Sequence, residues 1–185
     1  VRAHFISELT IQDSYSITGE SLHHLVNVIR IEINEDLLLL NGKGLSVITK
    51  VTAQSKKFLT LNYLSSNHAK KDDRIDVVVG MPKREALELS LKQSVELGFG
   101  KVFLVKSAYS QIKYPEDERL QSLLVSALEQ SNAAFLPDVL KSEWMNVPWE
   151  HYKSVVIMDS QTEKSELLPK DMGLQGPVLL VVGPE

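Results

Sequence analysis

Apolar runs alternate with segments of helical periodicity after residue 75, and this alternation constrains the fold more than any other feature of the chain. A β-branched run covers residues 75–81, and three shorter apolar runs cover residues 102–105, 154–158 and 178–182. Strands that alternate with helices form a parallel sheet covered on both faces. We therefore predict an α/β domain in this part of the chain, with its ligand site beyond the carboxyl ends of the strands. The loops concerned follow Met81, Val105, Met158 and Val182.

Two helices are expected between these strands. Residues 83–98 carry Leu87, Leu91 and Val95 on one face and finish at Gly98, which suits a helix C-terminus. Residues 116–131 predict a second long helix that ends before Pro137, and a short segment around residues 163–168 lies between the last two strands.

The first 64 residues have a different pattern, typical of short strands and turns with one helix. Residues 3–6 predict an edge strand, and residues 21–30 predict a short helix with apolar side chains at helical spacing. Residues 37–40 and 45–51 flank the turn Asn41-Gly42-Lys43-Gly44 and predict a hairpin, and residues 58–64 predict a further strand. This part is expected to be a small β-barrel or sheet.

The polar segment 65–73 has almost nothing to bury and predicts a linker. We therefore place the domain boundary between a first domain, residues 1–68, and a second, residues 69–185.

Composition excludes several classes of protein. The 185 residues contain no cysteine, which excludes disulfides, thiolate catalysis and cysteine-ligated metal centres. No apolar run is long enough to span a bilayer, and no signal-peptide pattern opens the chain, so a cytoplasmic protein without a membrane partner is expected. His23 and His24 are adjacent on the predicted helix and point in different directions, so no metal site is expected.

Charge is unevenly distributed along the chain, whose net charge is −4. Residues 1–68 are balanced, residues 69–113 carry a net +3 and residues 114–185 carry a net −7. A polyanion would therefore contact the first two segments, although solvated surface charges without a partner explain the same distribution.

Four short motifs in one order carry a resemblance to a known family. They are His24-Leu25-Val26-Asn27-Val28-Ile29-Arg30; Met81-Pro82-Lys83 with Glu96-Leu97-Gly98; Ala127-Leu128-Glu129-Gln130-Ser131 with Pro137; and Leu180-Val181-Val182-Gly183-Pro184-Glu185. Together they resemble the 16S ribosomal RNA uridine-N3 methyltransferases of the SPOUT, or trefoil-knotted, superfamily. The dinucleotide, P-loop and nucleophile-elbow motifs are all absent.

The resemblance implies a PUA-like RNA-binding β-barrel followed by a SPOUT α/β knot domain. It also implies a homodimer that binds S-adenosyl-L-methionine and methylates N3 of one uridine in the 16S rRNA of the small ribosomal subunit. By position, the cofactor residues are Leu180, Val182, Gly183, Pro184 and Glu185. The RNA-binding candidates are Arg2, His24, Arg30, Lys83 and Arg84, each of which could instead be a solvated or structural group. Glu129 and Gln130 could orient a dimer interface or a pocket wall, or simply pack on the helix surface. No catalytic base can be named.

Departures from the family pattern keep other interpretations open. The family's P-K-G-D motif reads Pro82-Lys83-Arg84-Glu85, and residues 107–110 and 129–135 lack three arginines that would grip phosphates. The family continues beyond the position of Glu185, so the knot is expected to be incomplete in the sequence as given. The alternatives are a non-catalytic RNA-binding member of the family and, in a different class, a small-molecule enzyme on a doubly wound sheet.

Overall fold

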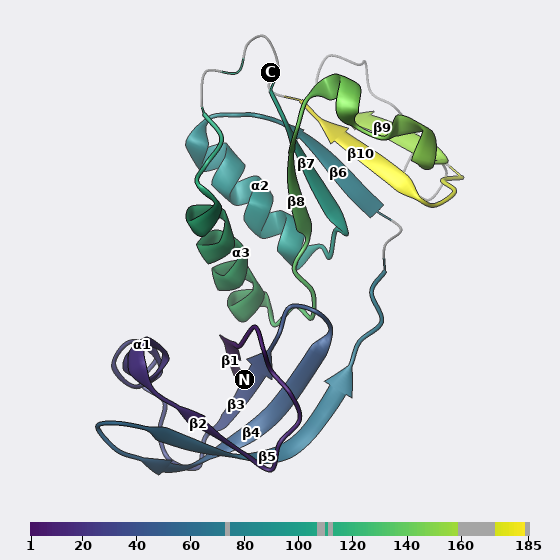
Figure 1. The fold of residues 1–185 in the computed structure, drawn as a ribbon. Coiled ribbons are helices and arrows are strands. Elements are labelled where there is room, and N and C mark those ends of the chain that lie inside the picture. Colours follow the sequence, from purple (N-terminus) through teal and green to yellow (C-terminus); the bar gives the residue numbers. More distant parts are fainter. Residues whose placement is uncertain (73–74, 107–109, 111–112, 159–172, 184–185) are drawn as a thin grey trace. The chain divides into compact units, whose positions relative to one another are not determined.

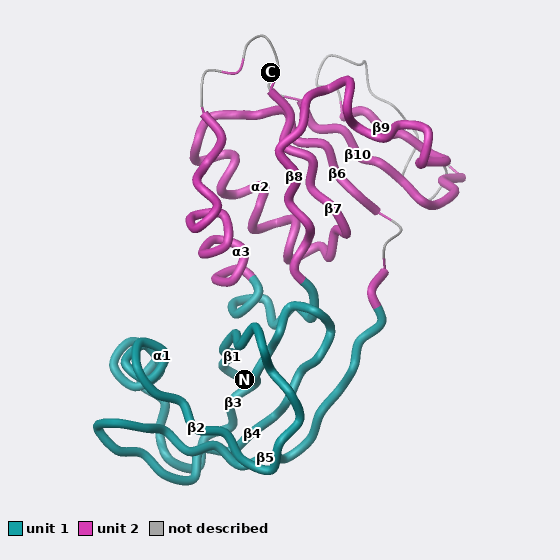
Figure 2. Tube along the Cα trace, viewed as in Figure 1, with its two compact units in different colours: residues 1–70, 128–135 teal, residues 71–127, 136–185 magenta. Residues whose placement is uncertain are grey.

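The computed structural model describes residues 1–72, 75–106, 110, 113–158 and 173–183. The chain forms two compact units (Figure 2). Unit 1 comprises residues 1–70 and 128–135, and unit 2 comprises residues 71–127 and 136–185. Each is described by itself below.

Unit 1 is built on a five-stranded sheet in the order β1-β3-β4-β5-β2 (Figure 1). The strands are β1 (Arg2–Phe5), β2 (Ser14–Ile17), β3 (Asp36–Leu40), β4 (Leu45–Gln54) and β5 (Leu59–His68). Strand β1 lies at an edge and runs parallel to β3, whereas the other pairs are antiparallel. The edge strand and the β3–β4 hairpin are confirmed. Asn41 fixes the hairpin turn, because its Oδ1 accepts hydrogen bonds from the backbone of Lys43 and Leu45.

The predicted helix over residues 21–30 is real but its bounds and type are wrong. The structure has α1 (Gly19–His23), which continues directly into a π-helical turn, η1 (His24–Val28). Arg30 then adopts a left-handed conformation with φ of 57°, which ends the helix. The predicted apolar face is confirmed: Leu22 and Leu25 are buried, and Val26 and Ile29 pack against the same core.

The predicted linker over residues 65–73 is wrong in its first part. Residues 65–68 belong to β5, which pairs with β4 along its length, including Ser65 with Ile48 and Ser66 with Val47. Backbone hydrogen bonds to β4 extend β5 through these polar residues, although their side chains bury little. Polar side chains therefore did not indicate the end of the strand.

Unit 2 contains the predicted parallel sheet, in the order β8-β7-β6-β10-β9. Its strands are β6 (Ile75–Gly80), β7 (Lys101–Val105), β8 (Asp138–Ser142), β9 (Ser154–Met158) and β10 (Val178–Val182), and all four pairings are parallel. Helices α2 (Arg84–Glu96) and α3 (Asp117–Ser131) are also confirmed. Strand β8 was not predicted. It is an edge strand with only two apolar residues, so it has no apolar run in the sequence. The predicted segment 163–168 lies outside the described residues.

The two faces of this sheet are covered differently. Helices α2 and α3 lie side by side against one face (Figure 1). The other face buries Val78, Phe103 and Leu179, and Val147, Trp149 and Tyr152 pack against it. Among the residues described, the cover there comes from the short turns η2 (Trp144–Asn146) and η3 (Trp149–His151). None of the described helices is both long enough and apolar enough to cross a membrane.

Candidate functional site

The carboxyl edge of the unit 2 sheet is the first candidate site. From β6 the chain adds β7 and β8 on one side, whereas β9 and β10 lie on the other side, with β10 directly beside β6. The carboxyl ends of β6 and β10 therefore form the topological switch point of the sheet, where open α/β sheets bind their ligands. The segments that follow these strands begin at Met81 and Gly183.

The predicted cofactor residues lie on and after β10. Leu180 is half-buried and pairs with Val77 of β6 and Val156 of β9. Val182 ends the strand opposite Val79 and Met158 and is 41% exposed. Pro184 and Glu185 lie outside the described residues.

Gly183 follows β10 in open space. A Cβ placed on it would meet no heavy atom of the described residues within 4 Å, and its backbone is outside the left-handed region that favours glycine. Neither packing nor backbone conformation therefore requires glycine here. The exposed apolar side chain of Val182 precedes Gly183, and a glycine without a side chain leaves its own backbone approachable.

The loop after β6 is anchored to β7 and then begins α2. Met81 is buried, and its backbone N–H donates to the carbonyl of Val105 at 2.8 Å. Lys83 is the exposed N-cap residue of α2, with no side-chain cap hydrogen bond. Lys83 therefore lies in the segment that leaves the carboxyl end of β6.

Arg84 is less available than its neighbour. Its Nε lies 3.1 Å from Glu88 Oε1, and the same oxygen accepts a hydrogen bond from Arg119 of α3. The hydrogen bonds from Arg119 and Arg84 lower the pKa of the Glu88 carboxyl. Two guanidinium groups thus share one carboxylate, so Arg84 is partly occupied within unit 2.

Lys106 is a cation at this edge that the sequence interpretation missed. It follows β7 directly, and its Nζ lies 4.6 Å from the centre of the Tyr114 ring. The Tyr114 hydroxyl donates to the carbonyl of Ser142 at the end of β8, 2.9 Å away. The sequence could have identified Lys106 as a candidate, because it is the first residue after a predicted strand at the edge where a ligand is expected. Residues 107–109, where the family pattern has an arginine, lie outside the described residues.

The RNA-binding candidates of unit 1 are partly brought together. One nitrogen of Arg2, Nη1, donates both to Glu35 Oε2 at 2.9 Å and to the carbonyl of Arg30 at 3.0 Å. Arg2 therefore holds the left-handed end of the helix in place, which is a structural role. The Arg30 side chain is exposed and has no hydrogen bond or ion pair within the described part of the chain. His24 is exposed at the start of η1.

Glu129 attaches residues 128–135 to unit 1. Its Oε1 accepts a hydrogen bond from the backbone N–H of Phe5 at 2.9 Å and lies 3.3 Å from His4 Nδ1. Burial raises the pKa of the Glu129 carboxyl, but the nearby His4 ring and the hydrogen bond from the Phe5 backbone N–H outweigh burial and lower it. Glu129 thus holds two segments of unit 1 together, and Gln130 is exposed. No group of three acidic or histidine side chains suited to a metal occurs among the residues described.

Comparison with known proteins gives a consistent assignment. A family model described as an RNA methyltransferase domain matches residues 69–185, and one described as an RNA methyltransferase PUA domain matches residues 17–62. Ribosomal RNA small subunit methyltransferase E of Bacillus subtilis is 26% identical, over 93% of this chain and 74% of that protein. The protein of the same name from Rickettsia conorii is 22% identical, over 89% of this chain and 69% of its own.

Solved structures agree in fold. A ribosomal RNA small subunit methyltransferase E from Neisseria gonorrhoeae, bound to S-adenosyl methionine, matches with a TM-score of 0.79 and 23% identity. The match covers 100% of this chain and 79% of that one. A structure from Legionella pneumophila in complex with bound SAM matches with a TM-score of 0.75 and 19% identity, over 99% of this chain and 79% of that one. At these identities the likeness shows the fold.

Proposed function

This chain belongs to the RNA methyltransferase family, and we propose that it transfers a methyl group from S-adenosyl-L-methionine to N3 of a uridine in 16S rRNA. One observation carries the proposal. The two family models match in the expected order, and the methyltransferase match covers a parallel sheet whose switch point carries an open glycine, Gly183. The cofactor residues we propose remain Leu180, Val182, Gly183, Pro184 and Glu185.

The reaction sets clear requirements for the site. S-adenosylmethionine supplies an electrophilic methyl group on a sulfonium. The new bond would join this methyl carbon to N3 while the carbon–sulfur bond breaks, the sulfur would leave with that electron pair as a neutral thioether, and the N3 proton would pass to water or a basic group. The protein must therefore hold the uracil ring in line and stabilise its developing negative charge.

Lys83 and Lys106 are suited to this electrostatic role. They follow β6 and β7, which are neighbouring parallel strands, so both ammonium groups start from the same edge of the sheet. Positive charge at this edge would stabilise a uracil anion or an adjacent phosphate. Arg84, tied to Glu88, contributes less.

We propose that RNA binding is divided between the parts of the chain as predicted, residues 1–68 and residues 69–185. In the first, His24 and Arg30 are the proposed RNA contacts, whereas Arg2 supports Arg30 through its carbonyl. In the second, Lys83 is the principal contact.

We further propose a cytoplasmic homodimer. Exposed apolar side chains on the edge strand β9 support an interface with another chain, since Ile157 and Met158 are 68% and 61% exposed. Light scattering on the purified chain would test the dimer.

The decisive experiment is methyl transfer. Labelled S-adenosylmethionine is incubated with the protein and small ribosomal subunits that lack the uridine modification, and the RNA is digested to locate the label. Label at N3 of a single uridine is the expected result. Binding to the subunit without any label would instead favour the non-catalytic RNA-binding alternative, which the missing arginines support.

A further inference from the structure

A hollow opens on unit 1 beside the helix that carries His24. It has a volume of about 560 Å³ and lies between the α1–η1 helix and the turn that joins β4 to β5. Its lining comprises Gly19, Leu22, His23, Val26, Asn27, Ile33, Gln54, Ser55 and Lys56. The size is within the range of about 300–1,000 Å³ typical of small-ligand sites.

The hollow has an apolar side and a polar side. Leu22 is buried, Val26 is half-buried and Ile33 is 51% exposed, so the apolar side can accept a flat ring. His23, Asn27, Gln54 and Ser55 supply hydrogen-bonding groups on the other side. An apolar surface next to such groups suits a nucleobase, which has an apolar face and a polar edge.

Asn27 is the best-placed group for reading a base edge. Its Nδ2 lies 2.9 Å from His23 Nδ1, and because an amide nitrogen can only donate, this contact orients the side chain. The second amide hydrogen and the Oδ1 acceptor remain, a pair that can bond a donor and an acceptor on one base. The helix passes from α to π geometry between these two residues, a local change common at functional sites.

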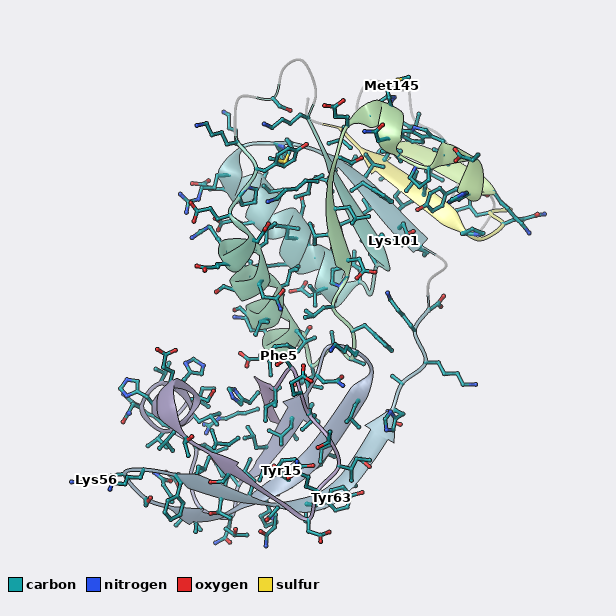
Figure 3. The ribbon with its side chains drawn as sticks, in the orientation of Figure 1. Phe5, Tyr15, Lys56, Tyr63, Lys101 and Met145 are labelled. Carbon is teal, nitrogen blue, oxygen red and sulfur yellow. The ribbon has the colours of Figure 1, made fainter. Side chains whose placement is uncertain are left out.

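The charge beside the hollow favours a phosphate. Ser55 Oγ accepts hydrogen bonds from the backbone N–H groups of Lys57 and Phe58 and so holds the turn. Lys56 lies at the outer end of this turn (Figure 3) and has no ion-pair partner among the residues that the structure describes. Lys56 and Lys57 outnumber the acidic Glu20 on the helix.

We propose that this hollow binds one nucleotide of single-stranded RNA. The base lies on Leu22, Val26 and Ile33 with its edge against Asn27, and the phosphate binds Lys56. This inference rests on the proposed function, because it assumes that the chain acts on RNA. It adds a second nucleotide contact, separate from the uridine that receives the methyl group.

The test uses the full chain and a ten-nucleotide oligouridylate that contains 4-thiouridine. Lys56→Ala should weaken binding about fivefold and reduce the salt slope by about 0.7, the value for one phosphate of a single strand. Asn27→Ala should weaken binding about fivefold at an unchanged salt slope, because it removes uncharged hydrogen bonds. Lys101→Ala is the matched control, an exposed lysine on unit 2 (Figure 3), and should change binding less than about twofold.

Crosslinking of the wild-type chain gives an answer that does not depend on any variant folding. Irradiation should attach the 4-thiouridine to peptides containing residues 19–27 or 54–56. Crosslinks only elsewhere, or a hollow that captures an apolar peptide and no RNA, would overturn the proposal. Methyl transfer is measured separately. Crosslinks at the hollow without methylation would refute the proposed methyltransferase activity. Methylation without these crosslinks would refute only the proposed nucleotide site in the hollow.

Discussion

The variant Gly183→Ala tests whether the fold or a bound ligand requires glycine at position 183. Within the described part of the chain the added methyl group meets nothing within 4 Å, and the backbone does not require positive φ. In such a position alanine stabilises a protein by about 0.4–1 kcal/mol, because it restricts the unfolded chain. For a chain of this size the melting temperature should stay unchanged or rise by about 1–4 °C.

The cofactor should respond in the opposite direction. If the adenosyl group approaches the backbone at Gly183, the new methyl group intrudes on it, and overpacking costs about 1–3 kcal/mol. That cost corresponds to an increase of about 5- to 150-fold in the dissociation constant for S-adenosylmethionine. Isothermal titration calorimetry measures the affinity, and melting without cofactor measures the stability.

Gly98→Ala is the matched control. Its φ is +73°, also with nothing within 4 Å, and it follows α2 at the other end of the sheet. Alanine there should lower stability by about 1 kcal/mol through backbone strain and leave cofactor affinity unchanged. An unchanged affinity for Gly183→Ala would refute the assignment of Gly183 to the cofactor site, and a lower melting temperature would show that the fold itself requires glycine there.

Three further outcomes are expected. Glu129→Gln should reduce the free energy of unfolding at pH 7 by about 1 kcal/mol. Because the pKa of Glu129 is lowered in the folded state, the stabilisation is present above the unfolded pKa and is lost as the pH falls through the folded pKa. Urea unfolding at pH 3 should therefore show little difference between the variant and the wild type. Lys83→Ala should weaken RNA binding and reduce the salt slope by about 0.7–0.9, measured by titration at several salt concentrations, and a slope equal to that of the wild type would remove Lys83 from the interface. Tyr152→Phe removes the hydroxyl that donates a hydrogen bond to the buried Asp76 carboxylate at 2.6 Å. Urea unfolding should show a free energy of unfolding about 1.5–3 kcal/mol lower than that of the wild type. A decrease below about 0.5 kcal/mol would mean that another donor replaces the hydroxyl.

Local pattern predicted most of unit 2, for a physical reason. The strands over residues 75–80, 102–105 and 178–182 are buried on both faces except at their ends, so mostly apolar runs predict them. Strand β8 lacks that signal, since as an edge strand it is half-exposed and contains Asp138 and Lys141. Its pairing with β7 depends on backbone hydrogen bonds that no side-chain pattern records.

Long-range contacts explain what was missed in unit 1 and in the candidate sites. Phe5 and Glu129 are 124 positions apart, and no local signal predicts that residues 128–135 pack with the first strand. The occupation of Arg84 by Glu88 was closer to prediction, because the two are four residues apart on a helix. The contribution of Arg119, from a different helix, required the fold.

The distribution of charge at the carboxyl edge has a consequence for how this chain would hold RNA. Arg84 and Arg119 share Glu88, so among the described residues that follow β6 and β7 the more available cations are the lysines Lys83 and Lys106. An ammonium is a point charge without the planar fork by which arginine binds phosphate bidentately. Lysines therefore give affinity that depends strongly on salt but little geometric selection. Selection of the right RNA would then need contacts with bases, which is the role that the hollow beside Asn27 can fill.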